Sequence, residues 1–249
     1  MKAVGIDLGG SGFRVGVYDI ATGQRTGPLR SFQHRASLHP DDVLLQIGEA
    51  LEGLGWNGPI GLGFPGAVVN NLIQTAPNLG RAWCEVDVEA ALSPFHGGQF
   101  SMLNDADAAA EGERRFGASH GDHACVLTLT VGTGLGTTVH QNGVLVPNLE
   151  YGRLPHPSRE GVLEAHLSGQ VRQAENLTLQ AWSKRFQEGL SFLEGRIRPD
   201  LVVVSGGITE HWSTLTPLLT TQARLVRATL TNDAGPLGAA LWVASNHLD

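Results

Sequence analysis

The sequence predicts an α/β protein built from a duplicated unit, with two α/β halves that face each other across a cleft. A buried strand, a glycine-rich turn, a second strand and a closing turn follow one another at residues 3–23, and the same order recurs at residues 124–143. Apolar strand-like runs alternate with helix-like segments elsewhere in the chain, as is typical of α/β folds. A chain of 249 residues has room for one large or two modest domains.

Three strands and a helix are predicted first. Residues 3–7 form an apolar run of strand length, residues 13–20 alternate between apolar and polar side chains, and residues 29–34 fit a third strand of the same meander. Pro40 and the two acids after it are typical of the first turn of a helix, which we expect to reach Leu54. The next expected elements are strands at 59–64 and 99–103 and an alanine-rich helix that ends at Phe116.

The second part of the chain repeats this arrangement. Strands are expected at 124–131 and 137–141, on either side of a glycine turn at 132–136. A long amphipathic helix is predicted at 176–196, because apolar side chains recur there at spacings of three and four residues. The remaining expected elements are a helix at 160–167, strands at 201–204 and 225–228, a helix after Gly207 and a final helix at 232–246.

Composition and charge exclude several classes of protein. The chain has 17 basic and 24 acidic residues, and its net charge of −7 makes general nucleic-acid binding unfavourable. Lys2 and Lys184 are its lysines, and neither lies in a Walker A context, so amides, hydroxyls and arginines must hold any phosphate. Cys84 and Cys125 are too few for a zinc site built mainly from thiolates or for a disulfide framework. Because no apolar run exceeds a strand and the start is unlike a signal peptide, we expect a cytoplasmic protein with no membrane segment.

Three glycine-rich turns, each directly after an apolar strand, are candidate phosphate-binding sites. Exposed amides in such turns bind phosphate oxygens, and a carboxylate at the strand end can position a hydrated Mg²⁺. A plain hairpin turn is the alternative for any one of them, but three in similar places favour binding. The turns are Gly9-Gly10-Ser11-Gly12 with Asp7 before it, Gly132-Thr133-Gly134, and Ser205-Gly206-Gly207 at an expected helix N-terminus.

Six short motifs follow one another along nearly the whole chain. They are residues 7–14 (DLGGSGFR), 63–66 (GFPG), 104–109 (NDADAA), 131–136 (VGTGLG), 145–152 (LVPNLEYG) and 205–208 (SGGI). In this order they resemble the motifs of the ROK (repressor, open reading frame, kinase) family of actin-like sugar kinases, and the LVPNLE run and short length are most similar to the polyphosphate glucokinases. The resemblance implies the actin-like, ribonuclease H-like duplicated fold. We expect domains at 1–104 and 105–231, with the C-terminal helix at 232–249 packed back on the first.

The resemblance also implies roles for individual residues. Asp105 matches the catalytic carboxylate that accepts the proton of the sugar hydroxyl. The alternative role for Asp105 is that of a helix N-cap, and for Asp107 the N-cap is the interpretation that we adopt. The positions matched to sugar contacts are Gly66, Asn78, Asn104, Glu150, Arg153 and Glu164. For Gly66 and Asn78, the alternative interpretation is an ordinary turn residue. For Glu150 and Glu164, the alternative is a solvated acid. The positions matched to donor phosphates are Asp7, Gly9, Gly10, Ser11, Gly12, Arg14, Gly132, Thr133, Gly134, Gly206 and Gly207, with Asp7 holding Mg²⁺ through water.

The chain departs from the family pattern in two places. Arg153 stands where the family usually has histidine, so it changes sugar recognition, binds an anion or pairs with Glu150. His156 is then either a substitute for that histidine or an ordinary loop residue. The cysteine-rich zinc motif of many members is absent, as in the polyphosphate glucokinases, so no structural zinc is expected.

We therefore expect a glucokinase, as a homodimer, that transfers a phosphoryl group from polyphosphate, ATP or both to the 6-hydroxyl of glucose. The alternatives are an ATP-only kinase for another hexose and a non-catalytic sugar sensor, although the family's repressors begin with a helix-turn-helix that this sequence does not show. Polyphosphate would need a cationic track of arginines. The alternative interpretation is that these arginines are solvated or paired with Glu111, Glu113, Glu160 and Glu175. The candidates for that track are Arg14, Arg114, Arg115, Arg153, Arg159 and Arg172.

Overall fold

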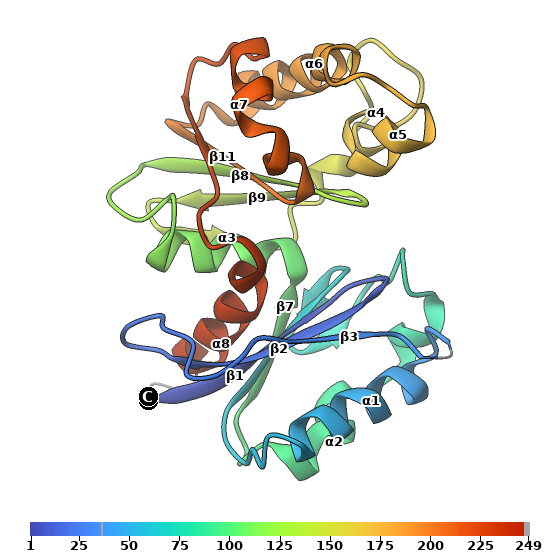
Figure 1. Ribbon diagram of the computed structural model, residues 1–249, viewed down its shortest axis with the longest axis vertical. Helices are drawn as coiled ribbons and strands as arrows, with labels where there is room; N and C mark the ends of the chain where they lie inside the picture. The colour runs from blue at the N-terminus through green and yellow to red at the C-terminus, as the bar shows by residue number, and fades with distance from the viewer. Residues whose placement is uncertain (36, 247–249) are drawn as a thin grey trace. The chain divides into compact units, whose positions relative to one another are not determined.

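The computed structural model describes residues 1–35 and 37–246, and the chain forms two compact units. The first contains Met1–Phe116 together with Asn232–Asp249, and the second contains Gly117–Thr231 (Figure 1). The predicted boundary between residues 104 and 105 falls inside the first unit, because helix α3 (Asp105–Phe116) packs against α8 (Ala234–Asn246). Residues 247–249 of the predicted C-terminal helix lie outside the described residues.

The centre of the first unit is a five-stranded sheet with the order β3-β2-β1-β4-β7. Its antiparallel meander is β1 (Lys2–Leu8), β2 (Gly12–Asp19) and β3 (Arg30–Gln33), and β4 (Ile60–Phe64) and β7 (Phe100–Asn104) continue in parallel with β1. Helix α1 (Pro40–Glu52) covers one face, where Ile47 is buried together with Val4 and Ile6. The carboxyl ends of β1, β4 and β7 therefore lie at one edge of the sheet, as parallel pairing requires.

Helix α8 lies on the other face of this sheet (Figure 1). Its backbone comes unusually close to the strands. A Cβ added at Gly5 would overlap the carbonyl oxygen of Pro236, and one at Gly238 would overlap that of Ala108 on α3. Glycine at these positions lets helix and strand backbones touch, so side chains cannot be exchanged there without moving an element. This packing places the start of α8 directly beside the end of β1.

The second unit repeats the topology of the first, with the sheet order β10-β9-β8-β11-β12. Its strands are β8 (Cys125–Val131), β9 (Leu135–Gln141), β10 (Val144–Val146), β11 (Leu201–Ser205) and β12 (Arg224–Arg227). β10, β9 and β8 are antiparallel, and β8, β11 and β12 are parallel, as in the first sheet. Helix α6 (Leu179–Ile197) buries Trp182, Phe186 and Leu190 against this sheet. The predicted duplication is confirmed.

Several local predictions were wrong in extent. The helix expected at 160–167 is restricted to α4 (Glu164–Leu167), because Gly161 has a φ of 91° that a right-handed helix cannot contain. The helix expected after Gly207 is a 3₁₀ helix (Gly207–His211) followed by the single turn α7 (Trp212–Leu215). Elements that the sequence did not indicate include β10, and also β5 (Val68–Val69), β6 (Leu72–Ile73), α2 (Val88–Leu92) and α5 (Gly169–Ala174). Over residues 1–35 and 37–246, every helix is too short or too polar to span a bilayer.

Candidate functional site

Asp7 lies near the end of β1, opposite Arg14 in the register of β1 and β2. Arg14 Nη1 donates to Asp7 Oδ2 at 3.0 Å. Burial raises the pKa of the Asp7 carboxyl above its usual value, and the Arg14 guanidinium opposes this shift. A Cβ added at Gly235, at the start of α8, would lie 2.7 Å from Asp7 Cγ, so the backbone of α8 closes one side of the carboxylate.

The first glycine turn connects β1 to β2 immediately after Asp7. Gly10 and Ser11 are exposed, and Gly9 N–H donates to the Gly12 carbonyl at 2.8 Å. His34, at the end of β3, donates from Nε2 to the Gly9 carbonyl at 2.9 Å and from its backbone N–H to the Ser11 carbonyl at 3.2 Å. The turn thus presents exposed backbone on one side and is held by His34 on the other.

Asp105 is the first residue of α3, at the carboxyl end of β7. Its Oδ1 accepts from Ala106 N–H at 2.8 Å. The helix cap is provided by Asn104, whose Oδ1 accepts from Ala106 N–H at 2.9 Å and from Asp107 N–H at 3.1 Å. Asp107 is buried within the first helical turn, and its capping role stays a prediction.

Asn104 also brings the GFPG motif to the start of α3. Its Nδ2 donates to the Gly66 carbonyl at 3.2 Å, and the parallel register places Asn104 beside Phe64. Gly66 itself packs so tightly that an added Cβ would overlap the Thr75 carbonyl. Asn78 is exposed in the loop after β6 and takes no part in the hydrogen bond between Asn104 and Gly66.

The second glycine turn, between β8 and β9, is bound by two segments far away in sequence. Leu135 N–H donates to Glu164 Oε2 at 3.0 Å, and the Gly132 carbonyl accepts from Gly169 N–H at 2.8 Å. A Cβ at Gly134 would lie 2.6 Å from the same Glu164 oxygen. Glu164 thus lies against the turn at the start of α4, although Thr133 at its tip is exposed.

The third glycine turn lies beside the second, because β11 is paired in parallel with β8. Gly206 has a φ of 86°, and a Cβ there would overlap the Val131 carbonyl, so this position requires glycine on both counts. The Gly206 carbonyl accepts from Thr209 Oγ1 at 2.8 Å. Gly207 has open space around its Cα, so its backbone remains accessible.

Arg153 lies between two carboxylates of the second unit. Its Nη1 is 3.8 Å from Glu164 Oε1, and the two side chains are 50% and 32% exposed. Partial burial raises the pKa of Glu150 above its usual value; Arg153 opposes the shift and the negative charge of Glu164 adds to it. Arg153 thus makes an ion pair with Glu164, which the sequence did not indicate, and its positive charge also acts on Glu150.

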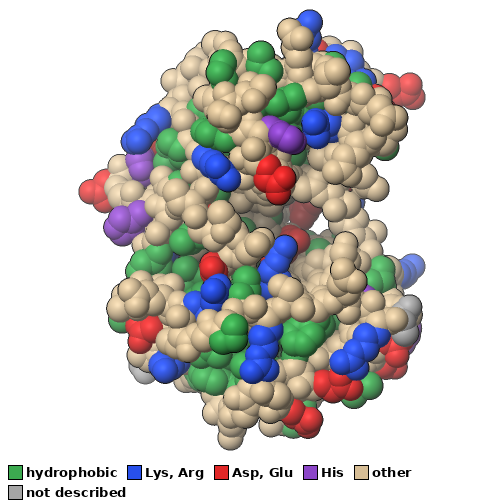
Figure 2. Space-filling view, viewed as in Figure 1, with side chains coloured by type: hydrophobic (Ala, Val, Ile, Leu, Met, Phe, Trp, Pro, Cys, Tyr) green, Lys and Arg blue, Asp and Glu red, His purple; other side chains and the backbone are tan. Residues whose placement is uncertain are grey.

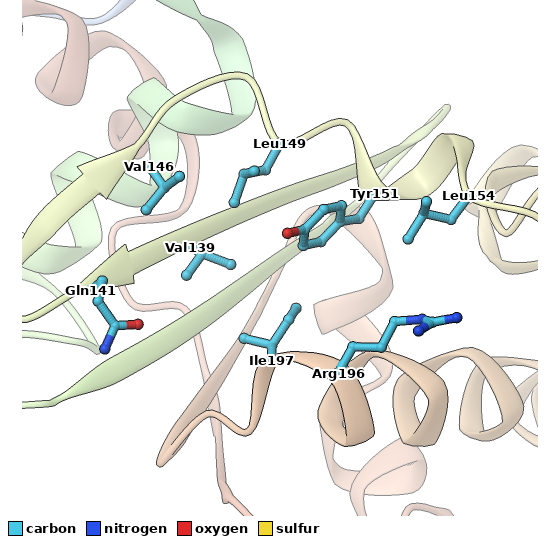
Figure 3. Close-up of a pocket in the computed structure, with 8 residues that line it drawn as sticks. All are labelled: Val139, Gln141, Val146, Leu149, Tyr151, Leu154, Arg196 and Ile197. Carbon is cyan, nitrogen blue, oxygen red and sulfur yellow. The ribbon is translucent and has the colours of Figure 1, made fainter.

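An open pocket of about 410 Å³ lies behind this segment. Leu149, Tyr151 and Leu154 point into it from the segment that carries Glu150 and Arg153, and Ile197 faces them from the end of α6 (Figure 3). Val139, Gln141, Val146 and Arg196 complete its lining. The segment therefore has an apolar side that packs over β9 and α6 and a charged side that holds the candidate residues.

His156 does not replace the family's histidine. Its side chain is fully buried, Nδ1 accepts from Ser158 N–H at 3.2 Å, and Nε2 faces Glu188 at 3.8 Å. Its pKa is lowered by burial first and by the neighbouring His166 second, while Glu188 opposes the shift. The ordinary structural interpretation of His156 is the one that the geometry supports.

The candidate arginines differ in how they are paired. Arg114 binds Glu111 at 2.8 Å, as the alternative interpretation expected, whereas Arg159 binds Glu188 at 2.8 Å instead of a near neighbour. Arg172 differs from them, because its Nε is buried and has no hydrogen-bond partner among the described residues. On the face drawn in Figure 2, Lys and Arg side chains are interspersed with Asp and Glu.

Within each unit, most of the predicted residues meet. In the first unit, Asp7 and the turn at 9–12 follow β1, and Asp105, Asn104 and Gly66 gather at the ends of β4 and β7. In the second unit, the turn at 132–134 meets Glu164, and Gly206 lies beside Val131. The sequence analysis missed His34, since nothing near it in the chain points to Gly9. The available signal was that a histidine follows directly after a strand of the meander that contains the turn.

Comparison with known proteins identifies similar sequences and structures. The sequence model described as the ROK family matches residues 3–148. A polyphosphate glucokinase of Mycobacterium tuberculosis is 37% identical over 95% of this chain and 89% of its own length, and one of Mycobacterium leprae is 32% identical over 96% and 74%. The crystal structure of an inorganic polyphosphate/ATP-glucomannokinase from Arthrobacter sp. strain KM superposes with a TM-score of 0.91 and 30% identity, covering 99% of both chains.

Proposed function

The chain belongs to the ROK family, and on this premise we propose that it is a glucokinase that uses polyphosphate, ATP or both to phosphorylate the 6-hydroxyl of glucose. It is a sugar kinase, a phosphotransferase, like the polyphosphate glucokinases with which it shares 37% and 32% identity over most of its length. The observation that carries the assignment is this near-complete coverage together with Asp105, which lies at the carboxyl ends of parallel strands, where α/β proteins place ligands.

Asp105 is the proposed general base. Phosphoryl transfer needs a positioned carboxylate to accept the proton of the attacking hydroxyl, and the rest of catalysis is orientation and charge neutralisation. The hydrogen bond from Ala106 N–H fixes one Asp105 oxygen, and Asn104 fixes the start of the helix behind it. These contacts support a carboxylate that keeps one orientation when a sugar approaches.

The proposed sugar contacts divide between the two units. In the first unit they are Gly66, Asn78 and Asn104; the bond from Asn104 to Gly66 supports a common binding surface for these two, and exposed Asn78 has the weaker support. In the second unit they are Glu150, Arg153 and Glu164, where charged groups lie within reach of one another. Carboxylates accept hydrogen bonds from sugar hydroxyls, and Arg153 can only donate.

The proposed donor site consists of backbone amides, hydroxyls and Arg14. The turn at 9–12, with exposed Gly10 and Ser11, is the best supported part, and the turns at 132–134 and 206–207 are its counterparts in the second unit. Amides in such turns can donate to phosphate oxygens without any lysine. Arg14, on β2 just after the first turn, adds a guanidinium that can donate to phosphate, and its contact with Asp7 orients it.

The residues of the first unit fit a hydrated magnesium ion at Asp7. Arg14 donates to Oδ2 of Asp7, so Oδ1 of Asp7 is left to face a hydrated ion. The proposed phosphate-binding turn begins at Gly9, two residues after Asp7. In the described chain no three His, Cys, Asp or Glu side chains are grouped to hold a metal, which suits an ion held by water, one carboxylate and phosphates. Magnesium bound there would neutralise charge on the donor phosphates.

A second sugar and a second donor have specific support. The Arthrobacter protein, which is named for both polyphosphate and ATP and for glucose and mannose, covers 99% of this chain at 30% identity. Steady-state transfer should therefore be measured for glucose and mannose, each with ATP and with long-chain polyphosphate, at low salt with Mg²⁺. Transfer to glucose supports the proposal, and the absence of transfer to glucose with both donors would refute it. A homodimer and a cytoplasmic location belong to the same proposal, and sedimentation and cell fractionation test them.

A further inference from the structure

His34 changes the hydrogen bonding of the first glycine turn. In a two-residue β-hairpin, the residues that close the turn normally exchange two hydrogen bonds. Here Gly9 N–H donates to the Gly12 carbonyl at 2.8 Å, but the reciprocal bond is absent from the described chain. The Gly9 carbonyl accepts from His34 Nε2 at 2.9 Å and is turned toward that ring instead of toward Gly12 N–H.

The backbone of His34 holds a second carbonyl of the same turn. His34 N–H donates to the Ser11 carbonyl at 3.2 Å. In a trans peptide the C=O and the following N–H point in opposite directions, and the described chain contains no cis peptide. Fixing the carbonyls of Gly9 and Ser11 toward His34 therefore directs the amides of Gly10 and Gly12 away from it.

The partner of the ring shows which nitrogen donates. A carbonyl oxygen can only accept, so Nε2 carries a hydrogen in this contact. Nδ1 is buried and has no hydrogen-bond partner among the described residues. A buried nitrogen without a partner is unfavourable for folding, and this cost offsets part of what the bond to the Gly9 carbonyl contributes to stability.

We propose that His34 is a positioning residue of the phosphoryl-donor site. By holding two carbonyls outward, it presents the amides of Gly10 and Gly12 as a pair of donors to the oxygens of a polyphosphate chain or of a nucleotide's phosphates. Phosphate oxygens accept hydrogen bonds, and amides of one turn that point to the same side are a suitable donor set. The inference rests on the proposed donor role of this turn.

Substitution of His34 by alanine tests this positioning. In His34→Ala the Gly9 carbonyl is released and can take Gly12 N–H back into the hairpin, so KM for the donor should rise about tenfold, as expected for one lost charge-assisted hydrogen bond. KM for glucose should stay within about twofold, and Tm should change by less than about 4 °C, because the unpartnered Nδ1 is lost together with one bond. Calorimetric titration with tripolyphosphate at low salt should give the same tenfold loss without turnover.

Two matched variants separate positioning from a merely structural role. His34→Gln places an amide N–H near the position of Nε2 and should restore most of the donor affinity. Gln33→Ala removes the exposed neighbour on β3 and should leave both KM values unchanged. Unchanged donor KM and tripolyphosphate affinity in His34→Ala, an equal rise in both KM values, or no rescue by His34→Gln would each overturn the proposal. Wild-type protein that neither transfers phosphate nor binds tripolyphosphate would instead refute the proposed function.

Discussion

Replacement of Asp105 by asparagine is the most direct test of the candidate site. Asparagine keeps an oxygen that can accept from Ala106 N–H, now at 2.8 Å, and Asn104 continues to cap the helix with bonds of 2.9 and 3.1 Å. Loss of a charge in the first turn of α3 lowers the free energy of unfolding by about 1 kcal/mol or less. Loss of the general base should lower kcat about a thousandfold, which corresponds to about 4 kcal/mol of activation free energy.

A coupled assay for glucose 6-phosphate measures this loss, and glucose binding by calorimetry should persist. Asp87→Asn is the matched control, because Asp87 caps α2 by accepting from Ala90 N–H at 2.9 Å in the same unit. It should retain wild-type turnover at a similar Tm. Asp105→Ala should lose as much activity as Asp105→Asn. Turnover within about tenfold of wild type in either Asp105 variant would refute the assignment, since general bases contribute more than this.

Four further predictions concern the sugar, the donor and the fold. Arg153→His should lower the sugar KM or widen sugar choice at unchanged Tm, because its exposed ion pair at 3.8 Å contributes little; identical kinetics with every sugar would contradict a role there. Activity with long-chain polyphosphate should fall more steeply with salt than activity with ATP, and equal slopes or ATP-only turnover would contradict the polyphosphate hypothesis. Sugar KM should rise as the pH falls through the raised pKa of Glu150, where its carboxylate is lost, and a persisting rise in Glu150→Gln would exclude this residue. Gly238→Ala should lower the free energy of unfolding by about 1–3 kcal/mol in urea titrations, because its Cβ would overlap the Ala108 carbonyl; an unchanged midpoint would contradict the close packing.

The sheets and the turns at their edges could be predicted because their signals are local. Apolar runs followed by glycine located β1 and β8, and the recurrence of that pattern indicated the duplication that both sheet orders confirm. The placement of Asp105 at the start of a helix also followed from a strand next to an alanine-rich segment. Helix ends were less predictable, since the start of α4 depends on the backbone of Gly161, which periodicity does not report.

The contacts that shape the candidate site could not be predicted, because they join residues distant in sequence. Glu164 binds Leu135 N–H across 29 residues, and Arg159 binds Glu188 across the same separation although Glu160 is its neighbour. Nearness in sequence is a poor guide to ion pairs between loops and helices, since long side chains choose partners by tertiary position. The bond from His34 to Gly9 has the same origin.

The two hairpin turns occupy equivalent places in the duplicated sheets but are held by opposite chemistry. In the first, His34 takes up carbonyl groups and leaves amides for an anion. In the second, the Glu164 carboxylate takes up the Leu135 amide and brings a negative charge to the turn, with Arg153 at 3.8 Å to offset it. Since phosphate is repelled by an uncompensated carboxylate, the proposed phosphate binding at the second turn would depend on that arginine. Arg153→His separates the two roles: a rise in donor KM would assign Arg153 to the phosphates, and a change in sugar KM alone would assign it to the sugar.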